Sequence, residues 1–278
     1  MGSTYESQES FNIRSDGDTE TPEVVDVAVL SVKGSQVIVV TDHNNNCLKS
    51  FYTKDGRKQN SKVKTIEKPL SLTKLPSNRV AAAVWPKRIV LVEATPDLQF
   101  LSSLQTCKQY RGLAALPDLT LAAASVTPGI DILDMKGHVL RSVFVPDTAQ
   151  QINHVPYFLC ASQKGNILVS DYGSKSVYCF SPEGHVLFAD TPRGEMRLQD
   201  PRGITVSKSG DIFLADWGAN VIIHLSEHGQ FERHILSGND GITKPLGLCL
   251  DDQEQLYVCL PGEVKVFRCA PLKLINFT

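Results

Sequence analysis

Short apolar or alternating runs recur along the chain, each closed by turn-forming residues. The unit is clearest in two copies: GNILVSDYGSKSVYCFSPEGHVL covers Gly165–Leu187, and GDIFLADWGANVIIHLSEHGQF covers Gly210–Phe231. A third copy, GSQVIVVTDHNNNCLKSFYTKDG, covers Gly34–Gly56. Apolar runs of this length between Gly, Asn and Asp clusters predict strands, and helical periodicity is almost absent. The pattern therefore indicates an all-β protein.

The copies are spaced like the blades of a propeller. Asp171 and Asp216 are 45 residues apart, and Asp42 precedes Asp171 by 129 residues, which is three times 43. A repeat of this length is typical of a β-propeller, in which each repeat supplies one four-stranded blade. The sequence predicts a six-bladed β-propeller of four-stranded antiparallel blades, formed by residues 11–278 as a single domain.

The predicted strands follow this period. In the first three blades they are Val25–Leu30, Gln36–Thr41, Cys47–Tyr52 and Val63–Ile66; Leu70–Leu75, Arg79–Val84, Arg88–Glu93 and Gln99–Leu104; and Gly112–Leu116, Leu119–Ala124, Ile130–Asp134 and Val139–Val145. In the last three they are Phe158–Ser162, Ile167–Ser170, Ser176–Phe180 and Val186–Asp190; Gly203–Ser207, Ile212–Ala215, Val221–Leu225 and Phe231–Leu236; and Leu246–Leu250, Leu256–Cys259 and Val264–Arg268.

The sixth blade needs a fourth strand, because an open ring leaves unpaired strand edges. Two segments are candidates, Phe11–Arg14 and Lys273–Phe277. Pro271 follows Val264–Arg268 closely, which favours the N-terminal segment. Residues 1–10 are polar and acidic, so we expect a disordered tail there.

Composition indicates where the protein is expected to reside more than what it does. The net charge is −2, which by itself indicates no partner. The seven cysteines form no C-x-x-C motif and most lie in apolar runs, so we expect buried thiols in a reducing, cytoplasmic compartment. No apolar run reaches 18 residues and no secretory leader is recognisable, so we expect no membrane association.

The motif G-x-I-x-V-x-D, followed by a turn, an apolar strand ending in Phe and a Gly turn, resembles the NHL repeat. The matching residues in the first copy are Asp42, Asn45, Leu48, Phe51 and Gly56. The family's usual Arg, five residues after the Asp, is replaced in the three copies by Cys47, Ser176 and Val221. Over residues 11–270 the chain resembles the C-terminal NHL-like propellers of tripartite-motif (TRIM) E3 ubiquitin ligases, including an antiviral member.

This resemblance implies a non-catalytic recognition module that targets RNA or a protein substrate, with a role in innate immunity. The family's RING, B-boxes and coiled coil have no counterpart in this sequence, which lacks dense Cys/His spacings and heptad runs. We therefore expect ubiquitin transfer, if any, to require a RING outside this chain. We expect the propeller to be a monomer without cofactors, and its parent to oligomerise through an external coiled coil.

The candidate binding surface is the top face, formed by the turns between second and third strands and by the connections between blades. Basic and aromatic residues gather there, and those expected to contact RNA or an acidic protein surface are Lys87, Arg88, Lys108, Tyr110, Arg111, Tyr172, Lys175, Arg193, Arg197, Arg202, Trp217 and Lys244. Bidentate pairing with acidic side chains would use the arginines. Two plainer interpretations remain: the two tryptophans, Trp85 and Trp217, pack between blades, or the basic residues form only a solvated rim.

A metal-dependent propeller hydrolase or lyase is the alternative function, with Asp42, Asp171 and Asp216 as channel ligands. An Asp that follows a strand, however, commonly accepts backbone N–H bonds within its own turn. We therefore interpret the three repeat aspartates as structural. No serine-hydrolase, phosphate-loop or zinc-protease motif occurs in the sequence.

Overall fold

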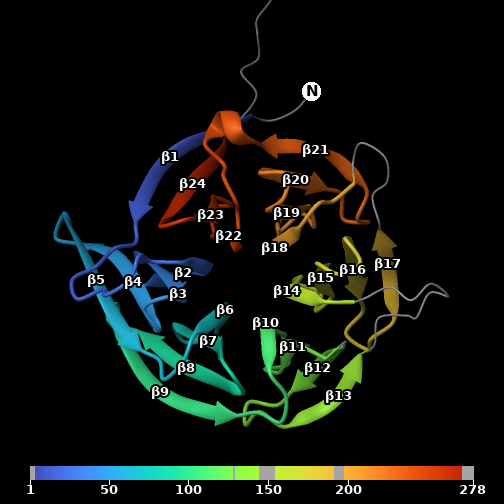
Figure 1. Ribbon diagram of the computed structural model, residues 1–278, viewed down its shortest axis with the longest axis horizontal. Coiled ribbons are helices and arrows are strands. Elements are labelled where there is room, and N and C mark those ends of the chain that lie inside the picture. Colours follow the sequence, from blue (N-terminus) through green and yellow to red (C-terminus); the bar gives the residue numbers. More distant parts are fainter. Residues whose placement is uncertain (1–3, 128, 144–153, 191–196, 271–278) are drawn as a thin grey trace, which may run out of the picture.

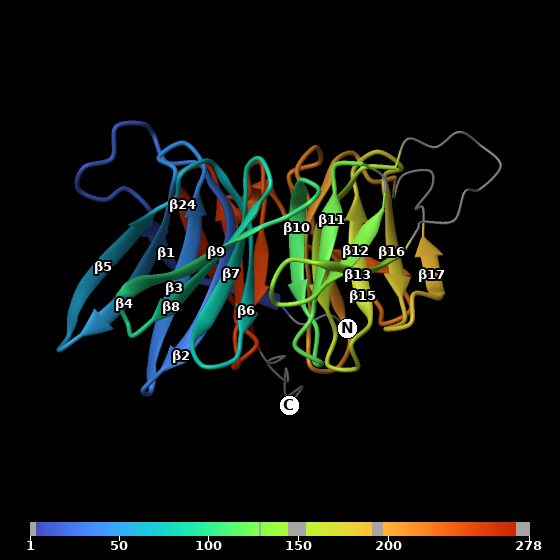
Figure 2. The ribbon, with the colours of Figure 1, turned by 90° about the horizontal axis from the view of Figure 1, so that it is seen from below.

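Six blades surround a central axis, and each is a four-stranded antiparallel sheet (Figure 1). The computed structural model describes residues 4–127, 129–143, 154–190 and 197–270. Viewed from the side, the ring is a disc whose turns and connections lie along two opposite faces (Figure 2). The predicted six-bladed β-propeller is confirmed. Within the described ranges, no helix is long and apolar enough to cross a bilayer.

The blades follow the chain, with the innermost strand first. Blades 1 to 3 are β2 (Val24–Val32), β3 (Ser35–Asp42), β4 (Cys47–Lys54) and β5 (Arg57–Lys64); β6 (Pro69–Leu75), β7 (Arg79–Val84), β8 (Arg88–Ala94) and β9 (Leu98–Gln105); and β10 (Tyr110–Ala115), β11 (Leu121–Ser125), β12 (Ile130–Leu133) and β13 (Val139–Val143). Blades 4 to 6 are β14 (Pro156–Ala161), β15 (Ile167–Asp171), β16 (Ser176–Phe180) and β17 (Val186–Asp190); β18 (Pro201–Val206), β19 (Ile212–Asp216), β20 (Val221–Leu225) and β21 (Phe231–Leu236); and β22 (Leu248–Leu250), β23 (Leu256–Leu260), β24 (Glu263–Ala270) and β1 (Thr4–Asn12). A 3₁₀ turn, η2 (Gly238–Asp240), precedes the last blade.

The core lies between neighbouring blades rather than within them. Successive strand residues point to opposite faces of a sheet, and in β3 they enter different interfaces. Val37 and Val39 pack against blade 2, whereas Ile38 and Val40 pack against blade 6. The described residues form six apolar clusters, one for each pair of adjacent blades. Because both faces of most strands are buried, their sequences are apolar runs rather than simple alternations.

The N-terminal strand closes the ring. β1 pairs antiparallel with β24, from Thr4 opposite Ala270 to Asn12 opposite Glu263. This confirms the N-terminal alternative, and the segment 273–277 lies outside the described residues. The strand nevertheless begins at Thr4 instead of Phe11, so most of the expected disordered tail is a strand. Its polar sequence is compatible with an outermost position, where one edge of the strand faces solvent.

Two other boundaries differ from the sequence prediction. In blade 1 the fourth strand is β5, Arg57–Lys64, and not Val63–Ile66; Ile66 is 73% exposed beyond its end. The strand follows the Asp55-Gly56 turn directly, and its polar side chains hid it from a search for apolar runs. In blade 3, Leu119 has a φ of 63° and lies in the turn before β11.

The described cysteines are free, as expected. Four of them, Cys47, Cys179, Cys249 and Cys259, are buried, and burial raises the pKa of each thiol. Cys107 departs from the prediction because it is exposed in the connection between blades 2 and 3.

Candidate binding site at the mouth of the channel

The three repeat aspartates hold the turns of the top face in place. Asp171 Oδ1 accepts the N–H groups of Val155 and Ser174, each at 2.9 Å. The other two accept equivalent bonds: Asp216 from Gln199 (2.7 Å), Asp200 (2.9 Å), Gly218 (3.1 Å) and Ala219 (3.1 Å), and Asp42 from Glu23 (3.2 Å) and Asn45 (3.3 Å). Each carboxylate thus accepts N–H bonds within its own turn, as the sequence predicted. It also ties that turn to the segment leading into the same blade.

Asp42 belongs in addition to a buried ion cluster. Lys49 Nζ lies 2.7 Å from Asp42 and 2.6 Å from Asp18, and it donates a 3.0 Å hydrogen bond to the carbonyl of Ile13. Burial alone would raise the pKa of Asp18, but hydrogen bonds from Lys49 and the Ser15 N–H outweigh it and hold that pKa below its usual value. The cluster fastens the segment between β1 and β2 to blade 1.

A β-bulge near the start of the innermost strands shapes the mouth of the channel. In each of blades 1 to 5 the register between the first and second strands shifts at such a bulge. The shifts lie, in blade order, between Val24 and Val27, Pro69 and Leu72, Tyr110 and Gly112, Pro156 and Phe158, and Pro201 and Ile204. A bulge redirects side chains locally. The residues within four of these bulges, Leu70, Arg111, Tyr157 and Arg202, all line one hollow.

This hollow, the mouth pocket, has a volume of about 820 Å³. Top-face turns and connections complete its wall with His43, Glu67, Lys68, Trp85, Val155 and Tyr172. The pocket therefore draws residues from blades 1 to 5 onto a single concave surface. Concave sites with a few convergent polar groups are the usual places for ligands.

Cations and aromatic rings alternate along the side of the pocket formed by blades 3 to 5. The guanidinium carbon of Arg202 lies 4.5 Å from the ring centroid of Tyr157 and 4.7 Å from that of Tyr172. Arg111 lies 5.4 Å from Tyr157, and Lys175 Nζ lies 3.8 Å from Tyr172. Such contacts contribute roughly 0.5–2 kcal/mol each. We call Arg111, Tyr157, Arg202, Tyr172 and Lys175 the cation–aromatic ladder.

The two arginines of the ladder differ in their partners. Arg202 forms an ion pair with Asp200: Nη2 donates a 3.0 Å hydrogen bond to Oδ2, and Nε lies 2.6 Å from Oδ1. Among the described residues, Arg111 and Lys68 have no carboxylate partner, and Glu67 is the acid of the pocket wall. Within the described part of the chain, the mouth pocket therefore presents one fixed guanidinium that is paired with a carboxylate and one half-buried guanidinium that is not.

The structure brings together only part of the predicted site. Arg111, Tyr172 and Arg202 line the mouth pocket, and Lys175 lies against Tyr172. Trp217 and Lys244 are not among the lining residues but contact each other, with Lys244 Nζ 5.3 Å from the centroid of the Trp217 ring. The remaining predicted cations lie apart from the pocket: Lys87 and Arg197 are exposed, and Arg88 is half-buried with Nη1 3.4 Å from Ser103 Oγ. Arg193 lies outside the described residues.

Tyr110 and Lys108 are both bound to Asp131. Tyr110 is 3% exposed, and its hydroxyl donates a 2.7 Å hydrogen bond to Asp131, so no base can stack on its ring. Burial and this bond raise the pKa of Tyr110 well above its usual value. Lys108 Nζ lies 2.9 Å from the same carboxylate, so its charge is already matched. Tyr110 precedes the bulge that redirects Arg111, and this explains the difference.

Sequence reasoning missed Tyr157, which the ladder needs. A signal was available: a proline opens the innermost strand of blades 2, 4 and 5, at Pro69, Pro156 and Pro201. The residue after each proline lines the mouth pocket. Trp85 also lines the pocket and is 46% exposed, so it does not serve as buried packing between blades.

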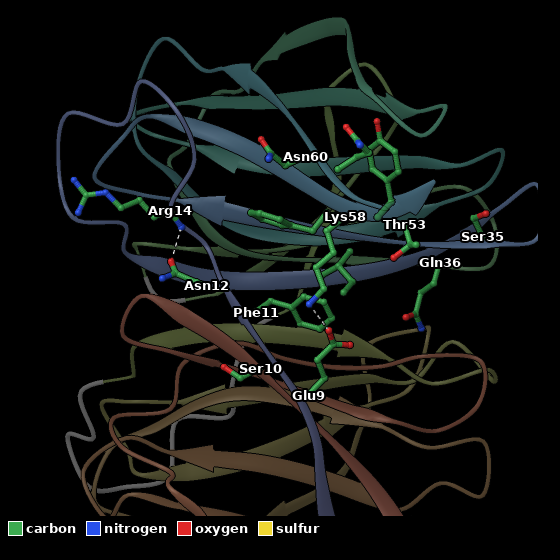
Figure 3. Close-up of a pocket in the computed structure, with 14 residues that line it drawn as sticks. Glu9, Ser10, Phe11, Asn12, Arg14, Ser35, Gln36, Thr53, Lys58 and Asn60 are labelled. Carbon is green, nitrogen blue, oxygen red and sulfur yellow. Dashed lines mark hydrogen bonds and ion pairs between the residues drawn. The ribbon is translucent and has the colours of Figure 1, made fainter. Parts of the chain in front are cut away.

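A second hollow, of about 590 Å³, lies where β1 meets blade 1 (Figure 3). Lys58 Nζ bridges it, 2.7 Å from Glu9 and 5.3 Å from the Phe11 ring. The paired side chains are 74% and 45% exposed, so the ion pair contributes little to stability. Its charged groups largely pair with each other, and we regard the mouth pocket as the better candidate site.

In the described part of the chain, no group of three or more His, Cys, Asp or Glu side chains is placed to hold a metal ion. No protein-family model matches the sequence.

Curated relatives are E3 ubiquitin-protein ligase TRIM56 from Mus musculus, 29% identical over 93% of this chain, and from Bos taurus, 27% identical over 95%. The chain spans 35% of the length of each, about a third of the curated relatives it matches. The resemblance to TRIM ligases is therefore confirmed.

Among solved structures, virginiamycin B lyase from Staphylococcus aureus is similar to this chain, with a TM-score of 0.64 at 12% identity. The match covers 96% of this chain and 100% of the lyase. A Bacteroides thetaiotaomicron protein of unknown function matches 93% of this chain and 73% of its own, with a TM-score of 0.66 at 13% identity. At these identities the likeness extends to the fold alone.

Proposed function

We propose that this chain is the C-terminal targeting domain of a TRIM-type E3 ubiquitin ligase. It would bind RNA or a protein substrate on its top face and leave ubiquitin transfer to a RING elsewhere in the protein. One observation carries the proposal: a concave mouth pocket in which Arg111, with no acidic partner among the described residues, lies beside a fixed ladder of cations and rings. The TRIM56 relatives support the ligase context.

The setting is part of the same proposal. The free cysteines support a reducing compartment, and we propose the cytoplasm. We also propose a monomeric propeller within an oligomeric parent, and a role in innate immunity, on the resemblance to TRIM ligases.

A metal-dependent hydrolase or lyase is the second candidate, and the fold that the chain shares with the Staphylococcus aureus lyase is compatible with it without supporting its chemistry. The acids it would need, Asp42, Asp171 and Asp216, are engaged by backbone N–H groups. A chelator should leave the melting temperature of the propeller unchanged. A clear decrease would favour the enzyme.

The binding proposal is tested by crosslinking the full-length parent in cells and sequencing both the RNA and the protein that copurify. A triple variant, Arg111→Glu, Arg197→Glu and Lys244→Glu, should lose most of the crosslinked partners because three cations of the top face become acids. The matched control makes the same charge change in exposed turns of the opposite face, with Lys54→Glu, Arg57→Glu and Lys164→Glu. If the top-face variant melts normally and keeps all its partners, the basic residues are a solvated rim and the proposal is wrong.

A further inference from the structure

We infer that the mouth pocket binds a short acidic peptide segment in which a bulky apolar residue lies beside a carboxylate residue. This inference rests on the proposed function and specifies its ligand. The feature that carries it is the position of Arg111, between an apolar stretch of the pocket wall and the rest of the ladder.

The carboxylate would bind Arg111. Its guanidinium is partly buried beside Tyr157, and among the described residues it has no acidic partner. Charge-assisted, two-pronged hydrogen bonds to a carboxylate would satisfy this fork with little loss of side-chain freedom. Lys68 and Lys175 lie in or beside the pocket and would interact with further acidic residues of the peptide.

The apolar residue would lie on blade 2. Leu70 lines the pocket there at the bulge of β6, and Trp85 projects from the β7–β8 turn with 46% of its surface exposed. Large exposed aromatic side chains beside a hollow often anchor a partner. Blade 2 precedes blade 3 around the ring, so this apolar wall adjoins Arg111.

The size and rigidity of the pocket suit a short segment. Its 820 Å³ falls within the roughly 300–1,000 Å³ of pockets that enclose drug-sized ligands. Arg202 is held by Asp200 and two rings, so the wall opposite Trp85 is already ordered before binding. Preordered side chains reduce the entropy lost on binding.

The same wall favours a peptide over stacked RNA. Single-stranded RNA is bound chiefly by phosphate contacts and by bases stacked on open aromatic faces. Tyr157 and Tyr172 each already have two cations against their rings, so a base would compete with those cations for the ring face. Tyr110 is buried.

The test is a selection from a display library of random decapeptides, with the chain as bait. Enriched peptides should share an Asp or Glu beside Leu, Phe or Trp. One enriched peptide, labelled with fluorescein, is then titrated by fluorescence anisotropy. Arg111→Gln should weaken binding about tenfold or more, and Trp85→Ala should also weaken it. The control, Lys87→Gln, changes an exposed cation next to Trp85 that lies outside the pocket, and should alter affinity less than about twofold.

Three results would overturn the inference: no enrichment, enriched peptides without acids, or unchanged peptide binding by an Arg111→Gln variant with normal melting. Titration with a twelve-nucleotide oligouridine separates the inference from the proposed function. If the RNA binds through Arg111 and no peptide is enriched, the top face is still a recognition surface and the peptide inference is wrong. If neither binds and the cellular crosslinks also fail, both are wrong.

Discussion

Replacing Lys49 by Met leaves two buried carboxylates without the ammonium group that lies between them. Lys49 and Asp42 are 0% exposed and Asp18 is 1% exposed at the side chain, and the two ion-pair distances are 2.6 and 2.7 Å. Met has a similar length and fills most of the same space, so the main change is the loss of charge. The variant thus measures what the cluster contributes to the attachment of residues 13–23.

The expected loss is large. Removing one partner of a buried ion pair costs about 3–5 kcal/mol, because the remaining charge is desolvated and unpaired. Here two acids lose the same cation, but Asp42 still accepts bonds from Glu23 and Asn45. Asp18 still accepts the Ser15 N–H at 2.9 Å and lies 3.8 Å from Lys62 Nζ. We therefore expect the free energy of unfolding to fall by about 4 kcal/mol, a substantial part of the roughly 5–15 kcal/mol of a typical domain.

The loss should also depend on pH. In the native chain the pKa of Asp18 is lowered, so its contribution is present above its ordinary pKa of 3.8 and disappears as the pH falls through the folded value. In the variant the two buried acids lack the Lys49 ammonium group and are destabilising while ionised, and acidification neutralises them. The difference between the two proteins should therefore shrink as the pH falls from about 7 to about 4.

Urea unfolding, followed by tryptophan fluorescence at several pH values, measures both effects. Adding Asp18→Asn to Lys49→Met should recover part of the loss, because one of the two buried charges that Lys49 compensated is removed. A loss below about 1 kcal/mol at neutral pH, or a loss that stays constant on acidification, would refute the reasoning.

Three further outcomes are expected. Asp216→Ala leaves four backbone N–H groups without their acceptor, so urea unfolding should show a loss above the roughly 1 kcal/mol of an ordinary helix cap; an unchanged midpoint would contradict this. Burial raises the pKa of Asp26 from 3.8 to about 7, because it outweighs the hydrogen bonds that the carboxylate accepts from the N–H groups of Leu72 and Val27. The contribution of Asp26 to stability should therefore decline as the pH rises from about 4 to about 7. Asp26→Asn should remove this slope from the pH profile of urea unfolding. Deleting residues 1–9 removes most of β1, so the melting temperature in calorimetry should fall, by about 2–4 °C for each kcal/mol lost, and an unchanged value would show that the pairing with β24 is dispensable.

The blade pattern was predictable because it depends on local signals. Asp42, Asp171 and Asp216 mark equivalent positions, and turns such as Asp55-Gly56 mark hairpins whatever the strands contact. β5 was misplaced because the outermost strand of a blade faces solvent and needs few apolar residues. Polar outer strands therefore leave little signal in a hydrophobicity pattern.

The binding site was less predictable because it depends on which way side chains point. Tyr110 and Arg111 are neighbours in sequence, yet one is buried on Asp131 and the other faces the channel mouth. A bulge decides between them, and it depends on pairing with a strand more than ten residues away. Tyr157 was missed for the same reason: its importance comes from Arg111 and Arg202, which belong to other blades.

The pairing of β1 with β24 has a consequence for biosynthesis. A ribosome makes β1 before β24, and this partner emerges only after some 250 further residues have been made. Contacts between such distant segments form late, because the loop between them must first be ordered. Until then β1 is an unpaired strand, the kind of segment that readily joins another chain. Its sequence, TYESQESFN, carries two glutamates and few apolar residues, which protects the nascent chain from aggregation while the ring is still open.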